Sequence, residues 1–219
     1  MNASLKHIDN YIFDLDGTIL NSSAKVLKCL KLAYIETNTP YEESRINMDV
    51  IGPPLRGILK IISPEIKDEK LIDKLVDAYF KHYYGESNSI TIYNGMYELL
   101  SSLKAKGKRL FIATNNPKAS TLKLLKMFDL NFFQDVYSVD KFDNIEMLKK
   151  RMVSEIIETY GLDKNKTAMV GDSMHDCFAA KKNSIFIVGV LWGYEKNKEE
   201  FIKSVDLAVK SAEELLVLL

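Results

Sequence analysis

Cysteine and histidine are scarce in this sequence. The 219 residues include two cysteines and three histidines. Cys29 and Cys177 lie far apart, without the paired spacing of a zinc site, and the histidines are scattered. This usage indicates a reducing compartment, and we expect a cytoplasmic protein.

Charge of one sign and long apolar runs are also lacking. Thirty basic and thirty acidic residues give a formal net charge of zero, so no overall field attracts nucleic acid or an acidic membrane surface. The longest apolar run, 185–192, is interrupted by Gly189 and is too short to span a bilayer. The first ten residues lack the apolar stretch of a secretory signal. We therefore expect a small-molecule partner, with no nucleic acid and no membrane, and either a monomer or a homodimer.

Glycine and proline are few as well, at ten and five residues. Hydrophobic residues make up 47% of the chain and charged residues 27%, as in ordinary soluble domains. Disorder, collagen-like repeats and coiled-coil rods are excluded on this composition. The length fits one large domain, or one domain with a smaller insert.

Short apolar runs rich in isoleucine, valine and phenylalanine alternate with longer stretches of helical period. This alternation is typical of a parallel sheet covered by helices. The predicted strands span residues 11–14, 109–114, 135–139, 167–170 and 185–191. The sequence therefore predicts an α/β fold with a Rossmann-like parallel sheet.

The stretch between the first two predicted strands differs from the rest. From Ser22 to about Tyr84 only helical patterns occur, which is too long for one crossover connection. We predict an α-helical cap at residues 21–88, inserted into a core domain made of residues 1–20 and 89–219.

The strongest chemical signal follows the first predicted strand. The strand ends at Asp14, and Asp16, Gly17 and Thr18 come next. Ligands of open α/β sheets bind at the carboxyl ends of strands, and residues two apart on a strand share a face. Two carboxylates there can bind Mg²⁺, or divide the roles of nucleophile and general acid/base.

Two weaker signals follow later strands. Asp172 and Asp176 come after the strand that ends near Gly171, four residues apart. Thr114 and Asn115 end another strand just before a predicted helix start, where free backbone N–H groups favour phosphate. Each is weak alone, but together with the first motif they indicate a phosphate site with a metal ion.

These motifs resemble those of the haloacid dehalogenase (HAD) superfamily of phosphohydrolases, and within it the phosphoglycolate phosphatase-like group with a helical cap. The resemblance rests on DLDGT at 14–18, ATNNP at 113–117, a lysine-led helix at Lys149, GDSMHD at 171–176 and VLWGY at 190–194. It implies a five-stranded parallel core with the first strand central, and a cap that closes over the substrate.

The resemblance also implies roles for the residues at the strand ends. Asp14 would be the nucleophile that becomes an aspartyl phosphate. Asp16 would protonate the leaving oxygen and then activate water. Mg²⁺ would be held by Asp14, by the backbone carbonyl of Asp16 and by Asp172. Thr114 and the N–H of Asn115 would hold phosphoryl oxygens.

The sequence departs from the group's pattern at two positions. The group most often has a lysine followed by proline, and no such pair occurs here. Three lysines follow the third predicted strand: Lys141, Lys149 and Lys150. We choose Lys149 as the catalytic lysine, because it should be the first residue of the helix that leads to the fourth predicted strand. Asn116 stands where the group often has lysine.

Three further residues complete the predicted site. Gly17 is assigned to substrate binding, and Asp176 orients the metal site from nearby. Arg56, in the insert, follows the turn at 52–54 and is the predicted cap contact, because its planar fork suits a carboxylate or a second phosphate.

The leading hypothesis is a Mg²⁺-dependent phosphatase that hydrolyses a small phosphate monoester through an aspartyl-phosphate intermediate. One alternative is a phosphomutase of the β-phosphoglucomutase type, which shares the same residues. Another is a non-catalytic phosphate-binding regulatory protein, although an acid/base carboxylate beside the nucleophile argues against it. The substrate stays open among phosphoglycolate, pyrophosphate, a nucleotide and a sugar phosphate.

Overall fold

The structure, a computed structural model, describes residues 5–85, 89–140 and 148–219. By its internal contacts the chain divides into an insert unit, Asn21–Thr91, and a core unit that contains the chain up to Leu20 and from Ile92 onward. The two short strands β2 (Leu20–Asn21) and β3 (Thr91–Ile92) pair with each other where the chain passes between the units.

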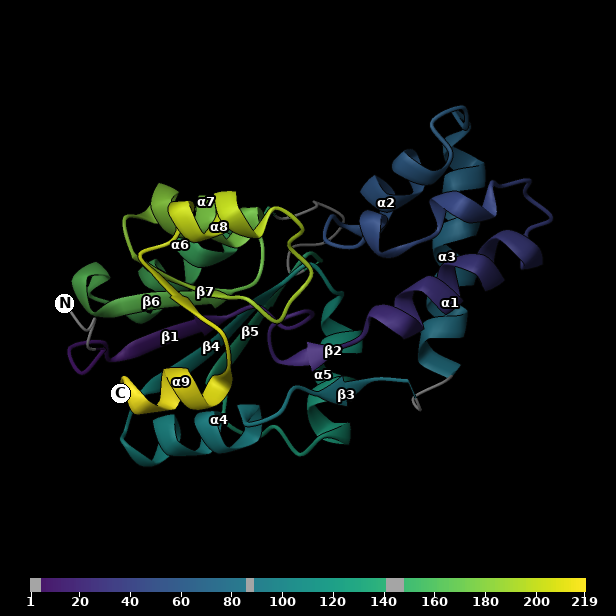
Figure 1. The fold of residues 1–219 in the computed structure, drawn as a ribbon. Coiled ribbons are helices and arrows are strands. Elements are labelled where there is room, and N and C mark those ends of the chain that lie inside the picture. Colours follow the sequence, from purple (N-terminus) through teal and green to yellow (C-terminus); the bar gives the residue numbers. More distant parts are fainter. Residues whose placement is uncertain (1–4, 86–88, 141–147) are drawn as a thin grey trace. The chain divides into compact units, whose positions relative to one another are not determined.

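A six-stranded sheet forms the centre of the core unit (Figure 1). Its order is β5-β4-β1-β6-β7-β8, and every neighbouring pair is parallel. The strands are β1 (Asn10–Phe13), β4 (Arg109–Thr114), β5 (Asp135–Ser138), β6 (Thr167–Gly171), β7 (Phe186–Val190) and β8 (Leu207–Val209). Because β1 lies between β4 and β6, the carboxyl ends of these three strands meet at one edge of the sheet.

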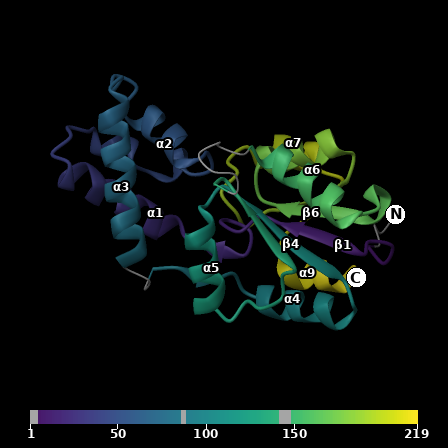
Figure 2. The same ribbon diagram turned by 180° about the vertical axis from the view of Figure 1, so that it is seen from behind.

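Helices cover both faces of this sheet (Figures 1 and 2). One face carries α6 (Lys149–Tyr160), α7 (Met174–Asn183) and α8 (Lys198–Ser204), and the other carries α4 (Met96–Ala105) and α9 (Ala212–Val217). The helix α5 (Lys118–Met127) follows β4, and a short 3-10 helix, η3 (Lys164–Lys166), precedes β6. Ile12, Phe111 and Met169 are buried in one core cluster with α6 and α7 residues. A sheet covered on both faces explains why its strands read as apolar runs.

Local sequence signals position the helices beside the strand ends. The helix α6 ends at Gly161, whose φ of 57° is the left-handed conformation that favours glycine. The helix α7 starts with a capping box, in which the Asp176 carboxylate accepts the backbone N–H of Ser173. The helix α7 therefore begins just beyond the end of β6, at the edge of the sheet where the predicted site residues lie.

The insert unit is helical. It contains α1 (Ser23–Glu36), α2 (Leu55–Ile62) and α3 (Glu69–Gly85), with two short 3-10 helices, η1 (Glu43–Arg45) and η2 (Met48–Val50). The helices α1 and α3 contact each other, and Leu30 and Leu75 are fully buried. In the described part of this unit, strand residues occur only at its two ends.

The predicted fold class, a parallel α/β sheet with an inserted helical segment, is confirmed. The expected count of five strands was wrong, because β8 adds a sixth at the edge. This strand, Leu207–Val209, is apolar but has only three residues between Asp206 and Lys210, which is too short to be recognised as a strand in the sequence. Across the described ranges, no helix has both the length and the apolar character needed to cross a membrane.

Candidate active site

Asp14 is the first residue beyond β1, the strand that lies between β4 and β6. Its backbone N–H donates to the carbonyl of Val170 over 2.9 Å, so the residue is fixed to the neighbouring strand. The carboxylate is buried, and its Oδ1 accepts the backbone N–H of Leu15 over 2.8 Å. A carboxylate is thus held in place at the carboxyl edge of the sheet.

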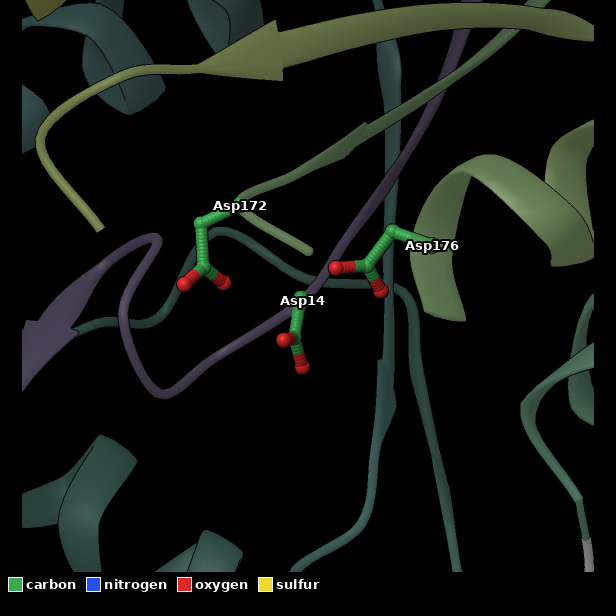
Figure 3. A group of neighbouring side chains, drawn as sticks. All are labelled: Asp14, Asp172 and Asp176. Carbon is green, nitrogen blue, oxygen red and sulfur yellow. The ribbon is translucent and has the colours of Figure 1, made fainter. Parts of the chain in front are cut away.

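Two more carboxylates lie next to Asp14. Figure 3 shows Asp172, which directly follows β6, and Asp176, which comes from the first turn of α7. One oxygen of each of the three aspartates lies within 4.8 Å of the others, and all three side chains are buried. The parallel pairing of β1 with β6 brings together residues that are more than 150 positions apart.

Lys149 is the cation of this cluster. It is the first residue of α6, and its side chain is 6% exposed. Its Nζ lies 2.9 Å from Asp14 Oδ1 and 2.7 Å from Asp176 Oδ1. The next residue, Lys150, is exposed, and Lys141 lies outside the described residues. The structure therefore brings Lys149, the lysine chosen from the helix register, to the predicted nucleophile.

The electrostatic balance of the cluster is negative. Burial raises the pKa of Asp14 well above its ordinary value; Lys149 opposes this shift, and Asp176 and Asp172 add to it. Burial, together with Asp176, raises the pKa of Asp172 to about 7. Burial disfavours the charge on Lys149, but Asp14 and Asp176 outweigh it and raise the pKa of the ammonium group. Among the described residues, the Lys149 ammonium group forms ion pairs with two of these three buried carboxylates, and the remaining negative charge favours a further cation.

Glycines make room for Asp172. At Gly17, where φ is 82°, an added Cβ would lie 2.3 Å from Asp172 Oδ2. At Gly193 it would lie 2.1 Å from the Cβ of Asp172. Both contacts are far too short for any side chain, so the backbone must approach this aspartate without one. Gly17, predicted to bind substrate, is placed beside Asp172.

Hydrogen bonds fix the Asp172 carboxylate on both sides. Thr18 Oγ1 donates to Asp172 Oδ1 over 3.2 Å, and the backbone N–H of Tyr194 donates to Oδ2 over 2.6 Å. Trp192 Nε1 donates to the carbonyl of Thr18 over 3.0 Å, and its ring contacts Tyr93. The sequence indicated Trp192 and Tyr194 only as part of the segment 190–194, and neither was assigned a role in the site, although Trp192 is the single tryptophan of the chain.

The end of β4 brings the predicted phosphate-binding residues to the same edge. Thr114 is buried, and its Oγ1 accepts the backbone N–H of Asn116 over 3.1 Å. Asn115 and Asp16 are half-buried. The side-chain amide of Asn116 donates to Asp16 Oδ2. This contact was missed from the sequence, where Asn116 stood out only as a departure from a lysine.

Arg56 is engaged in ion pairs within the insert unit. It lies in α2, and its guanidinium pairs with Glu69 at 3.3 Å and with Asp73, both from α3. The side chain is 43% exposed. In this structure the Arg56 guanidinium is therefore paired with two carboxylates of its own unit.

The donor set of the cluster fits Mg²⁺. Carboxylate oxygens are the ligands that this hard cation prefers, and Asp14 and Asp172 lie side by side with their charges only partly balanced. Asp176 is less suited as a direct ligand, because its Oδ1 already binds Lys149 and its Oδ2 binds the Ser173 hydroxyl. This arrangement agrees with an orienting role for Asp176.

Comparison with known proteins identifies the family. Residues 11–190 match the haloacid dehalogenase-like hydrolases, and the chain belongs to this family. It is 30% identical over 206 residues to the pyrophosphatase PpaX of Halalkalibacterium halodurans, with 91% of this chain and 90% of that protein covered. A crystal structure from Clostridium difficile has 27% identity and a TM-score of 0.82, covering 98% of this chain and 100% of that chain. A predicted phosphoglycolate phosphatase from Haemophilus somnus shares the fold, with 22% identity, a TM-score of 0.85, and 97% and 98% coverage.

The raised pKa of Asp172 predicts an unusual pH dependence of stability. The folded protein binds this proton more tightly than the unfolded chain does, so the metal-free protein should gain stability as the pH falls from about 8 to about 5. In excess chelator, the melting temperature of the wild type should rise by a few degrees over this pH range relative to that of Asp172→Asn. The variant lacks the titrating group and serves as the reference. Parallel curves of melting temperature against pH for the two proteins would contradict this prediction.

Proposed function

We propose that this protein is a Mg²⁺-dependent phosphatase that hydrolyses a small phosphate monoester through an aspartyl-phosphate intermediate. The observation that carries the proposal is the buried Asp14 at the carboxyl edge of the sheet, with Lys149 Nζ 2.9 Å from its Oδ1. A nucleophilic carboxylate needs a fixed orientation and a cation beside it, since its substrate is also an anion.

In the proposed reaction, an Asp14 oxygen attacks phosphorus, and the bond from phosphorus to the leaving oxygen breaks. Asp16, in its protonated form, gives its proton to that oxygen. In the second step Asp16, now ionised, takes a proton from water, whose oxygen attacks phosphorus. The bond from phosphorus to Asp14 then breaks, which releases phosphate and restores the Asp14 carboxylate and the protonated form of Asp16.

The neighbouring residues supply charge and hydrogen bonds. Asp14, the backbone carbonyl of Asp16, and Asp172 would hold Mg²⁺, which reduces the repulsion between the two anions when it is bound. The hydroxyl of Thr114 already accepts a hydrogen bond from Asn116, so its own proton can be donated to a phosphoryl oxygen. We assign the N–H of Asn115 and the turn at Gly17 to the same phosphoryl group.

The proposed partner is a small phosphorylated molecule. The names of the relatives refer to different substrates, pyrophosphate in one and phosphoglycolate in another. The names therefore support phosphate hydrolysis as the reaction and do not favour one particular substrate. Cys29 and Cys177 are both buried, and neither forms a disulfide among the described residues, which fits a reducing compartment such as the cytoplasm.

A screen of phosphorylated metabolites for phosphate release, with Mg²⁺ and with excess chelator, tests the proposal. We expect release with Mg²⁺ and its loss with chelator. A phosphomutase would instead interconvert sugar phosphates without net release. Binding of phosphate esters with neither outcome would favour the regulatory alternative.

Replacement of the nucleophile gives a direct prediction. Asp14→Asn keeps the shape of the side chain but removes the attacking oxygen anion, so phosphate release should fall by about a thousandfold or more. Far-ultraviolet circular dichroism should match that of the wild type, since the fold does not depend on this charge. Residual activity above about a hundredth of the wild type would contradict the covalent route.

The two adjacent lysines provide a matched pair. Lys149→Ala should lower kcat by about a hundredfold or more, because it removes the cation that contacts Asp14. Lys150→Ala, an exposed neighbour, should change kcat by less than about twofold. Lys141→Ala is measured alongside these two variants, and its loss of kcat should also be smaller than that of Lys149→Ala. A larger loss from Lys150 or Lys141 than from Lys149 would show that the assignment is wrong.

We also propose that the insert unit selects the substrate, with Arg56 as its polar contact. Arg56→Ala should lower kcat/KM about tenfold for a substrate that carries a carboxylate, such as 2-phosphoglycolate, and little for 4-nitrophenyl phosphate. Arg45→Ala is the matched control, because Arg45 is another exposed arginine of this unit in an ion pair, with Glu42. Unchanged kinetics for both substrates would assign Arg56 to its ion pairs with Glu69 and Asp73 alone.

A further inference from the structure

Asn116 contacts two residues of the proposed reaction at once. Its side-chain Nδ2 donates to Asp16 Oδ2, and its backbone N–H donates to Thr114 Oγ1 over 3.1 Å. Asp16 follows β1 and Thr114 ends β4, so Asn116 connects the two strand ends. One residue therefore ties the proposed acid/base to the proposed phosphate-binding hydroxyl.

The backbone of Asn116 is restrained by the proline and the helix that follow it. Pro117 follows it, with φ of −61°, and a residue before proline is confined to extended conformations. The carbonyl of Pro117 accepts the N–H of Thr121 in the first turn of α5, which anchors the proline to the helix. The proline and α5 thus limit the backbone conformations of Asn116, and with them the directions in which its side chain can leave the backbone.

We propose that Asn116 is a positioning residue for Asp16, which it holds in one orientation through both steps of the reaction. This inference rests on the proposed function. Asp16 must be protonated in the first step and ionised in the second. An amide N–H can donate to Oδ2 in both states, because that oxygen is a carbonyl oxygen in the acid and half of the anion in the carboxylate.

The chemistry predicts which reactions need this contact. In the first step the bond from phosphorus to the leaving oxygen breaks, and the electron pair stays on that oxygen, which takes the Asp16 proton. A phenolate needs this proton more than a 4-nitrophenolate, which leaves readily as the anion. Loss of the Asn116 amide should therefore slow phenyl phosphate hydrolysis more than 4-nitrophenyl phosphate hydrolysis.

The experiment compares kcat/KM for these two esters in full-length variants saturated with Mg²⁺. Asn116→Leu removes the donor, and Asn116→Gln keeps an amide on a longer side chain. The matched control is Asn131→Leu, because Asn131 is an exposed asparagine of the same unit whose amide also donates to a carboxylate, at Asp129.

We expect Asn116→Leu to lose about tenfold or more with phenyl phosphate and less than about threefold with 4-nitrophenyl phosphate. Asn116→Gln should recover part of the difference, and Asn131→Leu should match the wild type with both esters. The ratio of the two rates is the decisive readout, since a general loss of folded enzyme would lower both rates equally.

Equal losses with both esters, no loss, or a gain in rate would each overturn the positioning role. Failure of the proposed function gives a different result, because the wild type itself would then release phosphate from neither ester and Asp14→Asn would not differ from it.

Discussion

The interaction on which the site depends is the placement of one buried ammonium group among three buried carboxylates. Lys149 contacts Asp14 and Asp176 directly. Asp172 forms no ion pair with a described residue; Thr18 and the Tyr194 N–H hold it, and Lys198 acts on it electrostatically. Buried charges are costly unless they are paired and hydrogen-bonded. The cluster can therefore exist only where the backbone supplies these partners at fixed positions, and the carboxyl edge of a parallel sheet does so.

That requirement explains why the backbone around the cluster is rich in glycine. Gly17 and Gly193 approach Asp172 so closely that no side chain fits at either position, and a Cβ at Gly171 would lie 2.4 Å from the Asp176 carboxyl carbon. Each glycine costs conformational entropy on folding, and each lets a loop reach a carboxylate. The loop after β7 thereby brings the Tyr194 N–H to Asp172, and the charge cluster and the loop conformations depend on each other.

Most strands of the core sheet and most residues of the candidate site could be predicted from the sequence, because short local patterns mark them. Apolar runs that end in Asp14, Thr114 and Gly171 mark strands and their functional ends, and the helix register distinguishes Lys149 from Lys150. The sequence could not reveal β8, because its apolar run is only three residues long. Nor could it reveal the hydrogen bond from Asn116 to Asp16, since the two residues are 100 positions apart. Nor could it show that Arg56 pairs with Glu69 and Asp73, because that contact depends on how α2 meets α3.

The different partners of Asp14 and Asp16 suit two different roles for carboxylates only two positions apart. Asp14 faces an ammonium group, which stabilises only the ionised form, the form a nucleophile needs. Asp16 receives a neutral amide, which adds no charge and binds the carboxyl group whether or not it is protonated. A lysine at position 116 would favour the carboxylate of Asp16 and oppose its use as an acid. The asparagine at this position is therefore consistent with a division of labour set by the neighbours of each aspartate.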